Sequence, residues 1–139
     1  MKEYRTIVIE DDVRIRESML KMLSTFEEIV VVGESDGVEA GLQLINKQVP
    51  DILLLDLELV DGTGFDILDK LQDEKTQVVV VTGHESFAYK TIESEVTDCL
   101  LKPISRPSLQ LSLLKAFKNL DAFSAKDDME EMFFENNRL

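Results

Sequence analysis

Three groups of polar residues in this chain could contribute to a single site. Each directly follows a short apolar run: Glu10-Asp11-Asp12 follows residues 6–9, Asp56 follows residues 52–55, and Lys102-Pro103 follows residues 99–101. Such runs are typical of buried parallel strands, whose carboxyl ends lie at one edge of the sheet, where these folds bind ligands. We therefore expect carboxylates from two strands and an ammonium group from a third to meet at that edge.

Carboxylates held close together need a neighbouring cation, and a cluster of oxygen ligands suits a hard divalent metal. The combination of a metal, a carboxylate and a lysine indicates metal-assisted phosphoryl chemistry on an aspartate. Asp12 has a second interpretation, because it stands just before a helical pattern and could cap the helix N-terminus.

Short apolar runs alternate with segments of helical periodicity along most of the chain. The runs predict strands at residues 6–9, 29–33, 52–55, 78–81 and 98–101. The periodic segments predict helices at 13–26, from 38 to near Pro50, from 65 onward, at 86–96, and after a cap at Ser105. This alternation predicts an α/β fold, a doubly wound five-stranded parallel sheet in the order 2-1-3-4-5 with helices on both faces.

The overall composition limits the classes of partner. The net charge of −13 argues against direct nucleic acid contact by this domain and against binding to an anionic membrane. Cys99 is the single cysteine, so an internal disulfide and a structural zinc cluster are both excluded. The apolar runs are too short to span a bilayer, and residues 1–5 lack a signal-peptide pattern. We expect a cytoplasmic protein.

Four segments occur in the order and spacing of a known family: Val8–Asp12, Pro50–Asp56, Val79–Gly83 and Asp98–Pro103. Over residues 4 to 120 the chain resembles the receiver domain of two-component response regulators, which implies the flavodoxin-like receiver fold. The stretch from His84 to Pro103 is similar to receivers of LytTR-type regulators. The resemblance implies a switch that a sensor histidine kinase or phosphotransfer protein phosphorylates, and that controls a downstream output such as transcription.

The resemblance also implies a role for each acidic residue. Asp56 would be the phosphoacceptor, and Asp11 and Glu10 would bind Mg²⁺ together with it. Glu58 would offer its backbone carbonyl to the metal, while its side chain would face the phosphoryl entrance. Asp12 fits a helix cap better than a metal ligand.

The remaining roles fall on the last two predicted strands. Lys102 would pair with Asp56 and then with a phosphoryl oxygen, and we expect a cis peptide before Pro103; a surface lysine is the alternative. Thr82 would donate its hydroxyl to the phosphoryl group, unless it is an ordinary strand end. Gly83 would leave room beside the acceptor. His84 could tune the phosphoryl lifetime or be an exposed loop histidine.

Three positions depart from the family pattern. Cys99 stands where receivers usually carry an aromatic residue that swings inward on activation, so the aromatic part of that switch is absent. Glu95 replaces a glycine that commonly ends the fourth helix, and Val60-Asp61 replaces a proline-containing turn. These changes put the usual output surface in doubt but leave the predicted site intact.

Three functions are consistent with this pattern. The leading prediction is a phosphoacceptor switch that is not an enzyme, apart from catalysing its own phosphoryl transfer and autodephosphorylation. An aspartyl-phosphate phosphatase is less favoured, although Glu58 lies two residues after the nucleophile, because 139 residues offer no evident cap domain. A pseudo-receiver that only binds partners is disfavoured by the complete set of site residues.

The segment 121–139 differs from the receiver region at 1–120. It is acidic and its apolar residues include Met129, Met132, Phe133 and Phe134. It could extend the last helix, form a linker, or begin an absent output domain, since residues 133–139 resemble the first strand of a DNA-binding module. A stand-alone receiver could instead use this segment to bind a partner or to form a homodimer.

Overall fold

The computed structural model describes residues 2–91 and 95–137, and strands and helices alternate through them. In chain order the elements are β1 Tyr4–Ile9, α1 Val13–Leu23, β2 Ile29–Ser35, α2 Val38–Gln48, β3 Ile52–Asp56, β4 Glu58–Leu59, β5 Gly62–Thr63, α3 Gly64–Leu68, β6 Gln77–Thr82, α4 Glu85–Thr91, β7 Asp98–Leu101 and α5 Arg106–Asn136.

Five of the strands form one parallel sheet in the order β2-β1-β3-β6-β7. This is the predicted order 2-1-3-4-5, so the predicted topology is confirmed. The two-residue strands β4 and β5 form a separate antiparallel hairpin directly after β3, which the sequence pattern did not predict. That hairpin lies beside the carboxyl end of β3, where the predicted site is.

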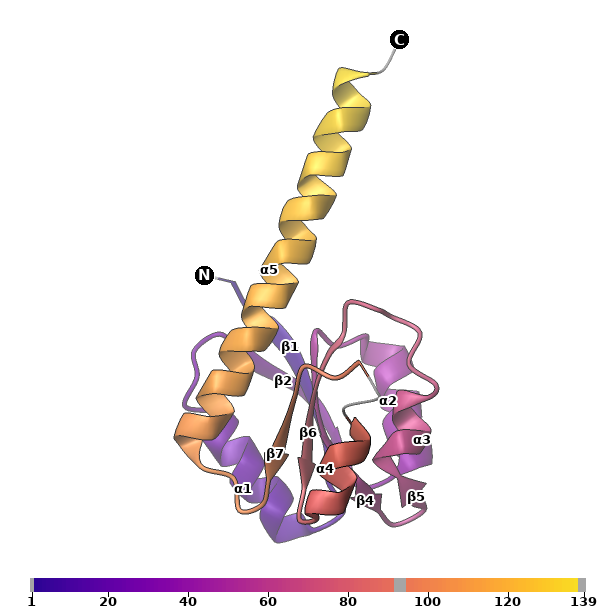
Figure 1. Ribbon diagram of the computed structural model, residues 1–139, viewed down its shortest axis with the longest axis vertical. Helices are drawn as coiled ribbons and strands as arrows, with labels where there is room; N and C mark the ends of the chain where they lie inside the picture. Colours follow the sequence, from indigo (N-terminus) through magenta and orange to yellow (C-terminus); the bar gives the residue numbers. More distant parts are fainter. Residues whose placement is uncertain (1, 92–94, 138–139) are drawn as a thin grey trace.

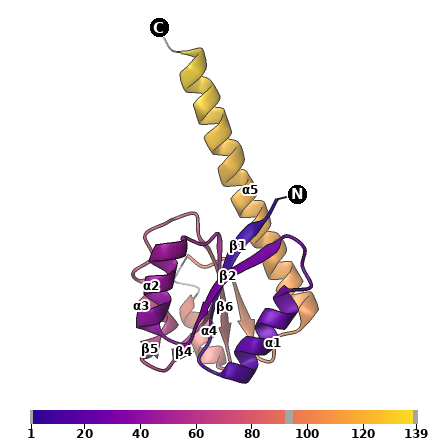
Figure 2. The ribbon, with the colours of Figure 1, turned by 180° about the vertical axis from the view of Figure 1, so that it is seen from behind.

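Helices cover both faces of the sheet, as Figures 1 and 2 show from opposite sides. On one face, α1 and α5 pack through Met19, Leu23, Leu109 and Leu113 onto alternate residues of the central strands. On the other face, α2, α3 and α4 cover the intervening residues of the same strands, whose side chains point the opposite way. The central strands β3 and β6 are buried along their whole length, which explains why their sequences are continuous apolar runs.

Three predicted helices end earlier than the periodicity indicated. Helix α3 ends at Leu68, although the pattern places Leu71 in the same helix. Helix α1 ends at Leu23 rather than at residue 26, and Phe26 reaches the core from the following turn, where its N–H donates to the Leu23 carbonyl. Helix α4 ends at Thr91. Of the rest of its predicted range, residues 92–94 lie outside the described residues, and Glu95 and Val96 are not helical. In each case an apolar residue beyond the helix end contacts the core at the spacing of a helix, which is why the periodicity overestimated the length of the helix.

Helix α5 continues far past the domain and projects from it (Figure 1). Its N-terminus is as predicted, with Ser105 accepting from the N–H of Ser108 and Pro107 in the first turn. Residues 133–136 are helical, so the interpretation of this stretch as a strand is wrong there; residues 138–139 lie outside the described residues. Among the described residues, no helix is both long and apolar enough to cross a membrane.

Candidate functional site

The register of the parallel sheet brings the predicted site residues together. Ile9 pairs with Leu55, so Glu10 and Asp56 follow neighbouring positions of β1 and β3. Asp56 in turn pairs with Val81, the residue before Thr82. Thr82 pairs with Leu101, and the Lys102 amide donates to the Thr82 carbonyl at 2.8 Å. Backbone pairing alone therefore places four of the predicted residues at one edge.

Lys102 supplies the positive charge of this site. Its Nζ lies 2.6 Å from Oε1 of Glu10 and 3.2 Å from Oδ2 of Asp56. Burial alone would lower the pKa of Lys102, but its contacts with Glu10 and Asp56 outweigh burial and raise that pKa. The lysine therefore stays charged between the two carboxylates, as predicted, and is not a surface lysine. The peptide bond before Pro103 is cis, as expected.

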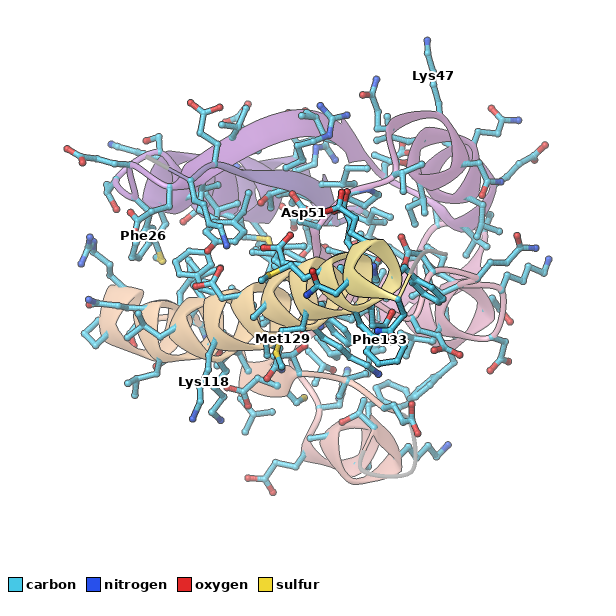
Figure 3. The ribbon with its side chains drawn as sticks, turned by 90° about the horizontal axis from the view of Figure 1, so that it is seen from above. Phe26, Lys47, Asp51, Lys118, Met129 and Phe133 are labelled. Atoms are coloured by element: carbon cyan, nitrogen blue, oxygen red, sulfur yellow. The ribbon has the colours of Figure 1, made fainter. Side chains whose placement is uncertain are left out.

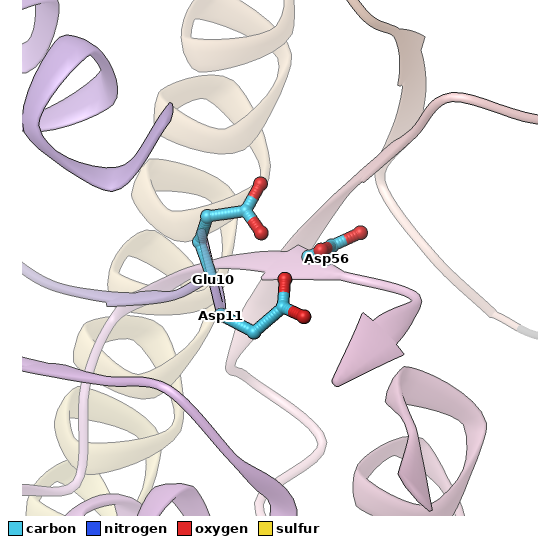
Figure 4. A group of neighbouring side chains, drawn as sticks. All are labelled: Glu10, Asp11 and Asp56. Carbon is cyan, nitrogen blue, oxygen red and sulfur yellow. The ribbon is translucent and has the colours of Figure 1, made fainter. Parts of the chain in front are cut away.

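Three carboxylates converge opposite this lysine (Figure 4). One oxygen each of Glu10, Asp11 and Asp56 lies within 4.8 Å of the others. Glu10 and Asp56 are almost completely buried, and Asp11 is half-buried. Burial, followed by the proximity of the other carboxylates, raises the pKa of Glu10, and burial and Glu10 raise the pKa of Asp11. One lysine does not neutralise three acids.

The donor set fits a hard divalent cation. Oε1 of Glu10 and Oδ2 of Asp56 are buried, and both depend on the single Lys102 ammonium group, whose Nζ lies 2.6 Å and 3.2 Å away. Buried carboxylates that share one cation are costly, and a second cation would relieve that cost. Carboxylate oxygens alone, without thiolate or imidazole, are the ligands that Mg²⁺ or Ca²⁺ prefers.

Asp12 does not belong to this cluster. Its Oδ1 accepts hydrogen bonds from the N–H groups of Arg14 at 2.9 Å and Ile15 at 3.2 Å. It is therefore the N-cap of α1, which confirms the preferred interpretation. The acidic triplet consequently splits into two residues that face Asp56 and one that stabilises the helix.

Two glycines shape the space around Asp56 in opposite ways. A Cβ on Gly64 would lie 2.6 Å from the Asp56 carbonyl oxygen, so β3 and the start of α3 can approach this closely only with glycine there. A Cβ on Gly83 would meet nothing within 4 Å. Gly83 therefore borders open space directly after Thr82.

Thr82 ends β6 with its side chain buried, and its Oγ1 accepts a hydrogen bond from the His84 N–H at 3.2 Å. Since this bond uses a lone pair, the hydroxyl proton remains free to donate. Asp56 is oriented by a comparable bond, in which the Glu58 N–H donates to its Oδ1 at 3.1 Å.

The side chains of Glu58 and His84 meet at the exposed mouth of the site. His84 Nε2 lies 2.6 Å from Oε1 of Glu58, and both side chains are about half exposed, at 55% and 53%. The His84 ring also stands edge-on to Phe87 of α4, with 5.4 Å between centroids. Sequence reasoning singled out both residues but missed their contact, since it joins two loops that follow different strands.

Cys99 is half-buried and packs with Phe87 and Val96 against the core beneath α4. Burial raises the pKa of its thiol. A small thiol side chain thus stands at the position where the family pattern has an aromatic residue.

The family model described as the response regulator receiver domain matches residues 6–114, which span the sheet, the acidic pair, Asp56 and Lys102. This chain belongs to the response regulator receiver family. The resemblance inferred from the four sequence segments is thereby confirmed.

Curated relatives of this receiver include sensory transduction protein LytT of Bacillus anthracis, with 30% identity over 113 residues that cover 80% of this chain and 46% of that protein. An uncharacterized response regulatory protein of Vibrio vulnificus is 31% identical over 113 residues, covering 81% of this chain and 47% of that protein. The receiver therefore spans about half the length of these relatives. The relatives named LytT agree with the narrower resemblance to LytTR-type regulators.

Solved structures agree with the fold. The response regulatory domain of protein mrkE from Klebsiella pneumoniae superimposes with a TM-score of 0.78 at 20% identity, covering 85% of this receiver and 98% of that chain. The response regulator domain of Thermotoga maritima CheB gives a TM-score of 0.72 at 19% identity, covering 86% and 98%. The five-stranded doubly wound receiver architecture is therefore shared.

Proposed function

We propose that this receiver is a phosphoacceptor switch, phosphorylated on Asp56 with the help of Mg²⁺. The observation that carries the proposal is the convergence of Glu10, Asp11 and Asp56 within 4.8 Å, with Lys102 in contact with two of them. A positioned carboxylate nucleophile, a cation-binding pair and a mobile ammonium group are the components that phosphoryl transfer to an aspartate requires.

Asp56 is prepared for nucleophilic attack. Its Oδ1 is held by the Glu58 amide, and its Oδ2 faces the Lys102 ammonium group at 3.2 Å. In the transfer a bond forms between an Asp56 oxygen and phosphorus, and the bond from phosphorus to the donor's leaving group breaks. Hydrolysis later reverses the modification when water attacks the same phosphorus.

Lys102 and Thr82 would contact the transferred group. The ammonium group of Lys102 already touches Asp56, so a short side-chain rotation carries it from the carboxylate to a phosphoryl oxygen. The free hydroxyl proton of Thr82 would donate to another oxygen. Because Thr82 also accepts from the His84 amide, a shift of Thr82 would move the loop before α4.

Glu10, Asp11, Asp56 and the Glu58 carbonyl would hold the metal. When bound, Mg²⁺ neutralises charge on the transferring phosphoryl oxygens. The chain's own contribution is to collect the oxygen ligands on one sheet edge and to keep Lys102 charged beside them.

Receiver domains accept phosphoryl groups from histidine kinases or phosphotransfer proteins, and we propose such a donor here. Control of transcription is proposed as the output, because of the resemblance to LytTR-type regulators. Residues 1–120 would form the signalling domain, and 121–139 a helical extension or a linker toward an output module. A phosphatase is less favoured, since the acid that would serve it, Glu58, is engaged with His84 at the mouth.

A small phosphodonor such as acetyl phosphate tests the proposal. We expect Mg²⁺-dependent labelling that reaches at most one phosphoryl group per chain and disappears in Asp56→Ala. The matched variant Asp51→Ala removes an aspartate at the opposite end of β3 and should keep the label. Labelling that persists in Asp56→Ala would refute the assignment of the acceptor. Multiple-turnover release of phosphate from a metabolite would favour the phosphatase.

A further inference from the structure

The last third of α5 projects from the domain without a packing partner among the described residues. The buried residues of α5 end at Leu120, whereas the helix runs on to Asn136 (Figure 1). Just beyond Leu120, Asp121 accepts from the Tyr4 hydroxyl at 2.7 Å and from Lys2 Nζ at 2.8 Å; farther out, among the described residues, Asp127 makes an exposed contact of 2.6 Å with Lys75. Isolated helices of about 15 residues are marginal in water, and most helices are stabilised by packing of one face. This extension needs a surface to pack against.

One side of the extension has the spacing of a coiled-coil seam. The residues of this side, which we call the α5 stripe, alternate three and four apart: Ala122, Ala125, Met129, Met132 and Asn136. All five are exposed, Met129 at 70% and Met132 at 60%. Met129 lies two residues, or about 200° of helical turn, from Asp127. Figure 3, which looks down α5, shows Met129 and Lys118 on the side away from Asp51.

The charged residues beside the α5 stripe indicate which partner helix binds it and whether that helix runs parallel or antiparallel. One flank is acidic throughout, with Asp121, Asp128 and Glu135, whereas the other carries Lys126 and the exposed Phe133. In a parallel pair of identical helices each flank faces the opposite flank of its partner, so Lys126 faces Asp121, which also accepts from Lys2 and Tyr4 of its own domain, and Phe133 faces Asp128. In an antiparallel pair the acidic flanks would face each other and repel. The acidic residues therefore permit self-association in one orientation.

We propose that the α5 stripe binds the same stripe of a second copy of this chain, as a parallel two-stranded coiled coil. The alanines allow the helices to approach closely at residues 122 and 125, and the two methionines fill the interface beyond them. Asn136 occupies an inner position, where a single asparagine favours a parallel dimer in one register. Toward the domain the stripe reaches Lys118, where the two lysines would repel and the helices diverge.

The interface has only two heptads, so the dimer is concentration-dependent. In sedimentation equilibrium of the whole unphosphorylated chain, the mass should rise from monomer to dimer between about 1 µM and about 1 mM. Met129→Glu with Met132→Glu places acids inside the interface and should raise Kd at least about tenfold. The control Phe134→Glu adds an acid at a residue that is 72% exposed but on another side of the helix, and should not change Kd.

Orientation is tested by cysteine crosslinking. Ala125→Cys should form an intermolecular disulfide under mild oxidation, because identical inner positions meet in a parallel pair. Ser124→Cys, also exposed but off the stripe, and the unmodified chain should not crosslink. A monomer at every concentration would overturn the proposal, as would a dimer unaffected by the two glutamates. Asp56→Ala should dimerise normally, so failure here is distinguishable from failure of the phosphoacceptor proposal.

Discussion

Glu10 and Asp56 are acids buried beside a single lysine. Roughly 90% of buried polar groups in proteins have a hydrogen-bond partner of their own, whereas Oε1 of Glu10 and Oδ2 of Asp56 share the Lys102 ammonium group. The raised pKa values of Glu10 and Asp11 express the same imbalance, since burial and the other carboxylates disfavour the charged forms. Burial and repulsion among these carboxylates therefore lower stability at neutral pH, which is consistent with the cation and phosphoryl site proposed above.

Asp56→Asn should stabilise the metal-free protein. It removes one of the buried negative charges while keeping the side-chain shape, and we expect the free energy of unfolding to rise by about 1–3 kcal/mol. Urea unfolding in a chelator measures the gain, and added Mg²⁺ should stabilise the wild type more than the variant. Asp128→Asn, the same change at an exposed position, should be neutral. A less stable Asp56→Asn in chelator would contradict the proposed electrostatic imbalance.

Tyr4 gives a pH-dependent prediction away from the site. Burial and a 2.7 Å hydrogen bond to Asp121 raise its pKa from 10.0 to about 12. Because the folded-state pKa is the higher one, the stabilising contribution is complete below about pH 10 and is lost between about pH 10 and 12. The tyrosinate absorbance of the wild type minus that of Tyr4→Phe should titrate near 12, and a midpoint near 10 would contradict the burial of this phenol.

Helix N-termini in this fold are capped in two different ways, and only one is local. Asp12 caps α1 from the adjacent position, which the sequence pattern predicted. Helix α2 starts after Gly37, which has no side chain to cap it; instead Asp61, from the loop after β4, accepts from the N–H groups of Val38 at 2.6 Å and Glu39 at 3.1 Å. A cap from more than twenty residues away depends on tertiary structure, so sequence spacing could not predict it.

The variant Asp12→Ala tests whether Asp12 acts only as the cap of α1 or also belongs to the carboxylate cluster. Loss of the two hydrogen bonds at the start of α1 should lower the free energy of unfolding by about 1 kcal/mol. Titration with Mg²⁺ should give an unchanged affinity, whereas Asp11→Ala should abolish binding. A loss of Mg²⁺ affinity in Asp12→Ala as large as that in Asp11→Ala would show that the triplet acts as a unit.

The approach of α3 to β3 depends on Gly64. An alanine there would place its Cβ against the Asp56 carbonyl oxygen, and overpacking of this kind costs about 1–3 kcal/mol. Gly83→Ala is the matched control, because its Cβ would enter open space and should leave stability unchanged. Thermal or urea unfolding measures the stability of both variants. Equal stability of the two would contradict this prediction, because β3 and α3 could then separate without cost.

For the molecule as a whole, the sequence predicted the order of elements better than their ends or their long-range contacts. The five strands were recognisable because a doubly wound sheet buries its central strands on both faces, which leaves unbroken apolar runs such as residues 78–81. The lengths of α1, α3 and α4 were overestimated, because Phe26, Leu71 and Val96 lie beyond the helix ends yet still contact the core. The packing of such residues depends on the tertiary fold.

The site was predictable for a related reason. Its residues follow the strands directly, so strand order and register fix their positions without knowledge of the loops. The contact between Glu58 and His84 was missed because both lie in loops, where spacing does not determine direction. The helical course of residues 121–136 was one of several possibilities, since their acidic and apolar residues suit a helix, a linker or a strand.

The central claim is that Asp56 accepts a phosphoryl group. The most direct measurement is peptide mass mapping of the chain after reaction with acetyl phosphate and Mg²⁺, with borohydride reduction to trap the acyl phosphate. We predict a single modified residue, Asp56, and no modification when a chelator replaces Mg²⁺. Modification at another residue, or equal modification in chelator, would contradict this account of the site.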